Sequence, residues 1–205
     1  MTVNNYTITG DHYFFLNFYR LENNDPDSLK EAGGSRSIIF PNFMEGQYQW
    51  FHYLSMAKKL RLNACMMKAR EAGYSQIEAA IIAKNYTVSR NSTNVCCAFA
   101  QVQLDKLLEK IWSALSFLDN YTDGGFSKGR IIDTAMLKKS GQFKLINGVK
   151  VPTGWLSTIQ GIVVDKPGKL RGDRTDILMF EEFGLWPGAL KAYTQADALV
   201  GQIGN

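Results

Sequence analysis

The sequence lacks the features that mark secreted, membrane-spanning and zinc-binding proteins. No apolar run reaches the roughly 18 residues that cross a bilayer. The start, MTVNNYTITGDHYFF, has neither the basic nor the continuous apolar segment of a signal peptide. The cysteines, Cys65, Cys96 and Cys97, show no C-x-x-C spacing, and the two histidines lie far apart. We therefore predict a protein that is not secreted and has no membrane span, with cysteines that are small buried core residues.

Acidic residues are scarce in one part of the chain. The net charge is +4, but the segment from Asp123 to Lys169 contains eight basic and three acidic residues, a local charge of +5. A basic region on a near-neutral body suits binding to a polyanion, because contacts with phosphates release condensed counterions. Lys138, Lys139 and Lys144 are the candidate DNA contacts. A lysine-rich surface that only keeps the protein dissolved is the alternative interpretation.

Hydrophobic periodicity predicts an α/β fold in a single domain, residues 1–205. One or two strands and a long surface loop are expected in the first 40 residues. Helices are predicted within 40–62, 76–88, 104–118 and 188–200, and strands at 63–68, 93–100, 157–165 and 175–180. The Asn147-Gly148 pair within FKLINGVKV is typical of a type I′ hairpin. This order favours a mostly parallel sheet flanked by helices, with a basic β-hairpin insertion at about 120–156.

The stretch MMKAREAGYSQ places a small glycine-containing loop between a predicted strand and a predicted helix. The N–H groups at a helix N-terminus point outward and can bind phosphate oxygens. In the usual phosphate loop a lysine follows the second glycine, whereas Tyr74 holds that position here. Gly73 and Ser75 are retained, and Lys68 and Arg70 bring positive charge from the other end of the loop. A simple turn remains the alternative.

Two carboxylates follow the predicted strand at 175–180. In ILMFEE, Glu181 and Glu182 come directly after four apolar residues. The carboxyl end of a buried parallel strand opens onto the crevice where ligands bind in open α/β folds. Adjacent acids at that place suit a nucleotide hydrolase, in which one holds Mg²⁺ and the other activates the attacking water. Two solvated acids at a strand end are the alternative.

These motifs resemble those of a known family. The segment GKLRGDRTDILMFEEFGLWPGALKAY resembles the Arg-Gly and Walker B segment of the large terminase subunits of tailed bacteriophages. KAREAGYS is similar to the deviant Walker A motif of that family, and DHYFFLNFYRL and FPNFMEGQYQWFHYL look like its lead-in. The resemblance implies an ASCE-type P-loop NTPase fold that couples ATP hydrolysis to translocation of double-stranded DNA.

The resemblance also implies roles for individual residues. Lys68 takes the Walker A lysine role and contributes to catalysis with Arg70 and Glu182, the catalytic carboxylate. Glu181 and Ser75 hold Mg²⁺, and Gln49 binds adenine from a lead-in helix within 1–62. The nucleotide-binding loop at the start of the 63–205 core consists of Lys68, Ala69, Arg70, Glu71, Ala72, Gly73, Tyr74 and Ser75.

The partners that the resemblance implies are those of a viral DNA-packaging motor. They are double-stranded DNA, the portal protein, the small terminase subunit and, for a full-length chain, further copies in a ring, all in the host cytoplasm at the procapsid portal. No nuclease domain is expected, because the sequence stops soon after the Walker B segment, as in a truncated or split gene product. Two alternatives remain open: a non-catalytic DNA-binding or assembly protein on a degenerate P-loop scaffold, and a helicase-like translocase.

Overall fold

The computed structural model describes residues 2–3, 6–8, 10–22, 37–67, 73–166, 169–170 and 174–197. The chain divides into two compact units, here named the N-terminal unit (Met1–Ile81) and the C-terminal unit (Ile82–Asn205). The boundary falls within helix α4 (Tyr74–Val88), so each unit contains part of that helix. None of the described helices is long and apolar enough to cross a membrane.

The N-terminal unit consists of helices with short strand pairs. Its elements are β1 (Thr2–Val3), β2 (Tyr6–Thr7), α1 (Gly10–Phe18), β3 (Leu21–Glu22), β4 (Ile38–Ile39), α3 (Glu45–Leu60) and the first part of α4. Helix α3 confirms the predicted helix with its basic last turn, Lys58 and Lys59. It ends at Arg61, which adopts the left-handed conformation with φ of 56°, a common way to terminate a helix.

Short strands lie near the N-terminus, as predicted, but the aromatic segment between them forms helix α1, which was not predicted. Its aromatic residues favour strands by local propensity, but the segment is helical, and some of its rings pack against α3. The ring of His12 stacks on Phe51 at 4.5 Å, and Phe15 lies 5.7 Å from the same ring. His12 is buried among these rings, and burial lowers its pKa and so favours the neutral imidazole. Tertiary packing therefore overrides the local preference.

The C-terminal unit is built around a five-stranded sheet with the order β11-β5-β10-β7-β6. Its strands are β5 (Thr93–Ala98), β6 (Arg130–Asp133), β7 (Leu137–Ser140), β10 (Thr158–Val163) and β11 (Ile177–Phe180). Its other elements are α5 (Gln101–Tyr121), the hairpin strands β8 (Gln142–Ile146) and β9 (Val149–Thr153), the 3-10 turn η2 (Phe183–Leu185) and α6 (Ala189–Asp197). The predicted strands at 93–100, 157–165 and 175–180 and the helix at 104–118 are confirmed.

The sheet is mixed. Strand β5 runs parallel to both of its neighbours, β10 and β11, whereas β7 pairs antiparallel with β10 and β6 pairs antiparallel with β7. The prediction of a mostly parallel sheet therefore holds for the three apolar strands. The sequence did not predict β6 and β7, because RIID and LKKS carry charged residues and form no apolar run.

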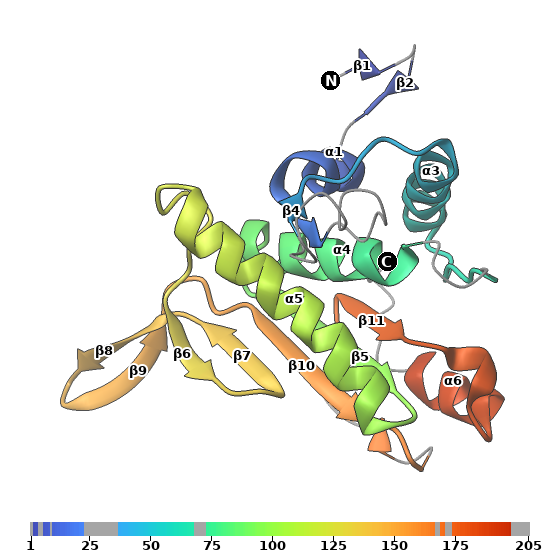
Figure 1. Cartoon of the computed structure of the whole chain (residues 1–205). Helices are drawn as coiled ribbons and strands as arrows, with labels where there is room; N and C mark the ends of the chain where they lie inside the picture. Colours follow the sequence, from blue (N-terminus) through green and yellow to red (C-terminus); the bar gives the residue numbers. More distant parts are fainter. Residues whose placement is uncertain are drawn as a thin grey trace. The chain divides into compact units, whose positions relative to one another are not determined.

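Each face of the parallel strands is covered by helical structure. On one face α5 packs on β5 and β10, as Figure 1 shows. On the other, Val95 and Cys97 of β5 form a core with Trp186, Ala192 and Ala196 from the region of η2 and α6. Cys96 and Cys97 are buried, as predicted, and burial raises the pKa of the Cys97 thiol to about 12. A continuous apolar strand is the expected result of burial on both faces.

Buried polar side chains tie the amino ends of these strands together. Asn94 is fully buried; its Nδ2 donates to the Thr158 carbonyl at 2.9 Å, and its Oδ1 accepts from Asn85 at 2.8 Å. The Ser157 hydroxyl donates to the Ser89 carbonyl at 2.5 Å, and its N–H donates to the Ser140 hydroxyl at 2.8 Å. Buried polar groups are costly unless they are paired, so these bonds favour one alignment of the strands.

Strands β8 and β9 form the predicted hairpin. Ile146 pairs with Val149 across the two-residue turn, and Asn147 and Gly148 have φ of 50° and 79°. Positive φ at both central residues is the requirement of a type I′ turn. The hairpin extends away from the five-stranded sheet in Figure 1.

Gly161 of β10 provides a test of the packing between α5 and the sheet. A Cβ atom at this position would lie 2.7 Å from Leu108 Cδ1 and 3.3 Å from Leu104 Cδ2, and both leucines are buried. We expect Gly161→Ala to lower the free energy of unfolding by about 1–3 kcal/mol, the usual cost of overpacking a core. Urea unfolding measures this change.

The matched control is Gly184→Ala, since a Cβ at Gly184 has no neighbour within 4 Å among the described residues. It should change the free energy of unfolding by less than about 0.5 kcal/mol. Equal effects of the two substitutions would show that α5 does not pack closely on β10 at Gly161.

Candidate active site

The two predicted carboxylates lie at the carboxyl edge of the parallel strands. The Glu181 N–H donates to the Cys97 carbonyl at 2.8 Å, which continues the hydrogen bonding of β11 with β5 one residue beyond the end of β11. The Glu181 carbonyl in turn accepts from the indole of Trp186 at 3.0 Å. Glu181 is half-buried and Glu182 is exposed. The strand end is therefore held on both sides, and the acids emerge where α/β folds bind ligands.

Gln103 in the first turn of α5 holds the carboxylate of Glu182. Its Oε1 accepts from the N–H of Ala100 at 3.3 Å, and its Nε2 donates to Glu182 Oε2. A backbone N–H can only donate, so the amide oxygen must face Ala100 and the amide nitrogen must face Glu182. Gln103 is not among the site residues predicted from the sequence. A glutamine three residues into a helix is a known capping position and would have indicated the bond to Ala100.

Glu182 has a backbone conformation that a non-glycine residue rarely adopts. Its φ is 50° and its ψ is 38°, in the left-handed region. This conformation costs an L-residue about 1–2 kcal/mol. Strained residues of this kind concentrate at functional sites, where the position of a side chain matters more than local stability.

The second predicted motif leads into α4 in the N-terminal unit. Gly73 has φ of 74°, and its carbonyl accepts from the N–H groups of Gln76 and Ile77 in the first turn of the helix. The helix begins at Tyr74, as the strand-loop-helix interpretation requires at this end. Residues Lys68, Ala69, Arg70, Glu71 and Ala72 lie outside the described residues.

The strand predicted at 63–68 is absent from its described part. Residues 62–67 have no regular structure, and Met67 is 99% exposed. Cys65 is exposed as well, which corrects its assignment to the core. A short apolar run specifies a strand only when other chain segments bury it, and here the side chains of the run are mostly exposed.

Two buried polar side chains of α3 lie beside the start of α4. Gln47 and Trp50 are 7% and 8% exposed, and neither Gln47 Oε1 nor Trp50 Nε1 has a hydrogen-bond partner in the described structure. Gln47 Nε2 lies 3.2 Å from the position of a Cβ at Gly73, and the rings of Trp50 and Tyr74 meet edge to face at 6.1 Å. A buried amide oxygen and a buried indole N–H without partners are suited to a ligand with its own donor and acceptor.

Gln49, the residue that the resemblance assigns to adenine, is exposed on α3. Two positions along an α-helix correspond to a rotation of about 200°, so Gln47 and Gln49 face nearly opposite directions. Gln47 is not among the predicted site residues, although its spacing of three from Trp50 places both on one helical face.

The expected Mg²⁺ ligands are in different units. Ser75 belongs to the N-terminal unit and Glu181 to the C-terminal unit, and each has an interaction with other groups. In the described part of the chain, no three His, Cys, Asp or Glu side chains form a group that could hold a metal ion. Mg²⁺ bound with a nucleotide needs only one or two protein ligands in addition to the phosphates, so a cluster is not required.

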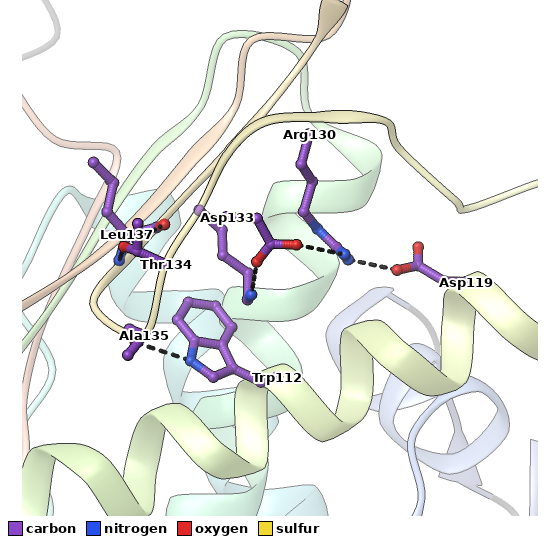
Figure 2. Close-up of polar contacts among 8 residues, drawn as sticks. Trp112, Asp119, Arg130, Asp133, Thr134, Ala135 and Leu137 are labelled. Carbon is purple, nitrogen blue, oxygen red and sulfur yellow. Dashed lines mark hydrogen bonds and ion pairs between the residues drawn. The ribbon is translucent and has the colours of Figure 1, made fainter.

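The predicted DNA-binding lysines have different environments. Lys138 forms an ion pair with Asp133, and its ammonium lies 4.6 Å from the ring of Trp112 in α5. Figure 2 shows the surrounding network, in which Arg130 joins Asp119 and Asp133 and the Trp112 indole donates to the Ala135 carbonyl. Lys138 thus contributes to holding β6 and β7 on α5. Lys139 is half-buried and Lys144 is exposed on the hairpin.

Comparisons with known proteins find likeness in structure and none in sequence. No family model matches the chain, and no curated protein sequence matches it. A phage terminase domain is similar in structure. It is the ATPase domain of the large terminase of Thermus phage P74-26, in an arginine-to-alanine mutant, with a TM-score of 0.48 and 12% sequence identity. The match covers 72% of this chain and 66% of that chain.

The backbone strain at Glu182 can be measured. Replacement by glycine removes the cost of the left-handed conformation, and the hydrogen bond lost from the described residues is the exposed one to Gln103. We expect Glu182→Gly to raise the free energy of unfolding by about 1 kcal/mol. The control is Glu181→Gly: Glu181 does not have a positive φ, so the substitution should destabilise by about 0.5–1 kcal/mol. Destabilisation by both would show that Glu182 is unstrained.

The environment of Lys138 predicts a loss of stability on its removal. We expect Lys138→Gln to lower the free energy of unfolding by about 1–2 kcal/mol, since both an ion pair and a cation–π contact are lost. The exposed Lys144→Gln should change it by less than about 0.5 kcal/mol. Urea unfolding at pH 7 measures both, and equal effects would contradict a structural role of Lys138.

The ion pair between Lys138 and Asp133 also makes the free energy of unfolding depend on pH. The hydrogen bond from Lys138 holds the pKa of Asp133 below its ordinary value. A depressed carboxyl pKa stabilises the fold at neutral pH, and this contribution is lost as the pH falls below about 4. The difference in unfolding free energy between wild type and Lys138→Gln should therefore shrink from pH 7 to pH 3.

Proposed function

We propose that this chain is an ATPase module of a viral DNA-packaging motor of the large-terminase type. The observation that carries this proposal is the pair of carboxylates after β11, with Glu182 strained and held by Gln103 at the first turn of α5. Motif resemblance to the large terminases supports it, as does the glycine turn at the start of α4. The proposal includes a P-loop fold of the ASCE type in which the β8–β9 hairpin is part of an insertion.

The roles of the residues follow from their chemistry. Glu182 accepts a proton from the water that attacks the γ-phosphate of ATP, and Gln103 keeps its carboxylate in position. The motif resemblance assigns Mg²⁺ to Glu181 and Ser75, and bound Mg²⁺ would neutralise phosphate charge. Lys68, Arg70 and the loop to Ser75 bind the phosphates.

We assign the base of ATP to Gln47 in place of Gln49. A buried amide next to the indole N–H of Trp50 offers an acceptor and a donor to the edge of a purine, whereas Gln49 is exposed. The Gly73 position lies directly beside this amide. Binding of the base there would satisfy two polar groups that are otherwise buried without partners, and this favours binding.

The proposed partners are double-stranded DNA, the portal protein, the small terminase subunit and further copies of the motor chain, in the host cytoplasm. One observation favours a second candidate, a non-catalytic DNA-binding or assembly protein on a P-loop scaffold. The segment before the loop forms no strand in its described part, residues 62–67, and a phosphate loop normally follows a strand.

Steady-state ATP turnover, with and without duplex DNA, separates the two candidates. We expect Glu182→Gln to lower kcat by about 10²–10⁴-fold with little change in nucleotide affinity, as for loss of a general base. Lys68→Ala should weaken nucleotide binding. Turnover at background together with no nucleotide binding by wild type would refute the enzymatic function and leave the non-catalytic candidate.

Gln47→Ala and Gln49→Ala form the matched pair for this assay. Loss of a hydrogen bond to the base should weaken ATP binding about tenfold in Gln47→Ala, and Gln49→Ala should bind as wild type does. The reverse result would return the base-binding role to Gln49.

A further inference from the structure

The hairpin arm, defined as Gln142–Thr153, is exposed on both of its faces. Its apolar side chains do not form a core: Phe143, Leu145 and Val149 are 56%, 71% and 62% exposed. In an isolated two-stranded hairpin, such exposure makes folding marginal at best. Exposed apolar side chains gathered on one element commonly mark an interaction site.

The base of the hairpin arm is firmly attached. Trp155, two residues after the arm, donates from its indole to the Tyr86 carbonyl at 3.0 Å, and the ammonium of Lys128 lies 4.4 Å from its ring. Arg90 donates to the Gly154 carbonyl at 3.1 Å. The arm therefore extends from an anchored base, and its distal end carries the exposed apolar side chains.

Charge identifies the kind of partner. No acidic residue occurs from 134 to 164, and Lys138 of β7 is already paired with Asp133. Lys144 and Lys150 are exposed on the arm, and no carboxylate of the described residues forms an ion pair with either. The arm therefore carries two uncompensated positive charges, which favours an anionic partner.

The two lysines lie on opposite faces of the ribbon. Lys144 pairs with Val151 and Lys150 pairs with Leu145 on adjacent rungs, and side chains of adjacent rungs point to opposite faces. Each face thus combines a lysine with apolar side chains. If the partner of the arm were a second copy of the chain, we would instead expect one continuous apolar face on the arm. The major groove of DNA admits a two-stranded ribbon, and phosphates line both of its sides.

We propose that the hairpin arm enters a groove of double-stranded DNA, with Lys144 and Lys150 on the phosphates and the apolar distal end against the groove. This rests on the proposed function, in which DNA is the translocated partner, and it names the contact. It replaces Lys138 by Lys150 among the DNA-binding residues. It also explains why an element with so little core of its own carries neither an acid nor an ion pair among the described residues.

The test is binding of the whole chain to a fluorescent duplex DNA at several salt concentrations. We expect Lys144→Gln with Lys150→Gln to lower affinity about tenfold or more near 100 mM salt and to make the slope of log K against log salt less negative by about 2. The control, Lys106→Gln with Lys191→Gln, removes two exposed lysines from α5 and α6 and should leave both values unchanged. Unchanged binding by the arm variant would overturn the proposal.

A second variant tests the apolar end of the arm. Leu145→Ser with Val149→Ser should weaken DNA binding with little change in salt slope, because it removes no charge. Far-UV circular dichroism and urea unfolding verify that every variant is folded. If the arm variants change sedimentation of the chain and leave DNA binding intact, the arm is an interface between copies and the DNA proposal is wrong.

The assay also separates this proposal from the ATPase proposal. Loss of DNA affinity in the arm variants of a chain that binds no nucleotide would support the arm and refute the ATPase function. If wild type hydrolyses ATP and the arm variants bind DNA as tightly as wild type does, the ATPase proposal is supported and the arm proposal is refuted.

Discussion

Strand β5 is buried on both faces and paired on both edges, and the arrangement of the C-terminal unit depends on this burial. Cys96 and Cys97 are fully buried and point to opposite sides of the sheet. Because buried backbone groups require hydrogen bonds, β10 and β11 must run alongside β5. Their parallel alignment brings the end of β11 next to the last residues of β5 and the first turn of α5. The position of Glu181 and Glu182 is thus a consequence of how β5 is buried.

Local stability and the position of the carboxylate conflict at Glu182. The chain leaves β11 through a left-handed residue, which glycine would occupy at lower cost. The carboxylate gains in return a defined hydrogen-bond partner in Gln103, whose own orientation is determined by the Ala100 N–H. Nucleotide hydrolysis requires such a positioned base, so a strained acid at this site is consistent with the proposed function.

The basic region from Asp123 to Lys169 has less positive charge available to a partner than its count of basic residues suggests. Arg130 and Lys138 are paired with acids and pack with α5, so they contribute to the fold. Lys169 pairs with Asp165 as well. Within the described residues, Lys144 and Lys150 of the hairpin arm form no ion pair, and the arm extends from a base that Trp155 anchors.

Elements with a local pattern could be predicted from the sequence: the long amphipathic helix α5, the apolar strands β5, β10 and β11, the Asn147-Gly148 turn and the acids after β11. Periodicity and turn chemistry depend on neighbouring residues, so they can be read without a structure. Tertiary structure alone decided that the aromatic segment at α1 is helical, that Gln47 rather than Gln49 is buried, and that Lys138 is paired. Burial and charge pairing are made by residues distant in the chain, and no local pattern specifies which of them meet.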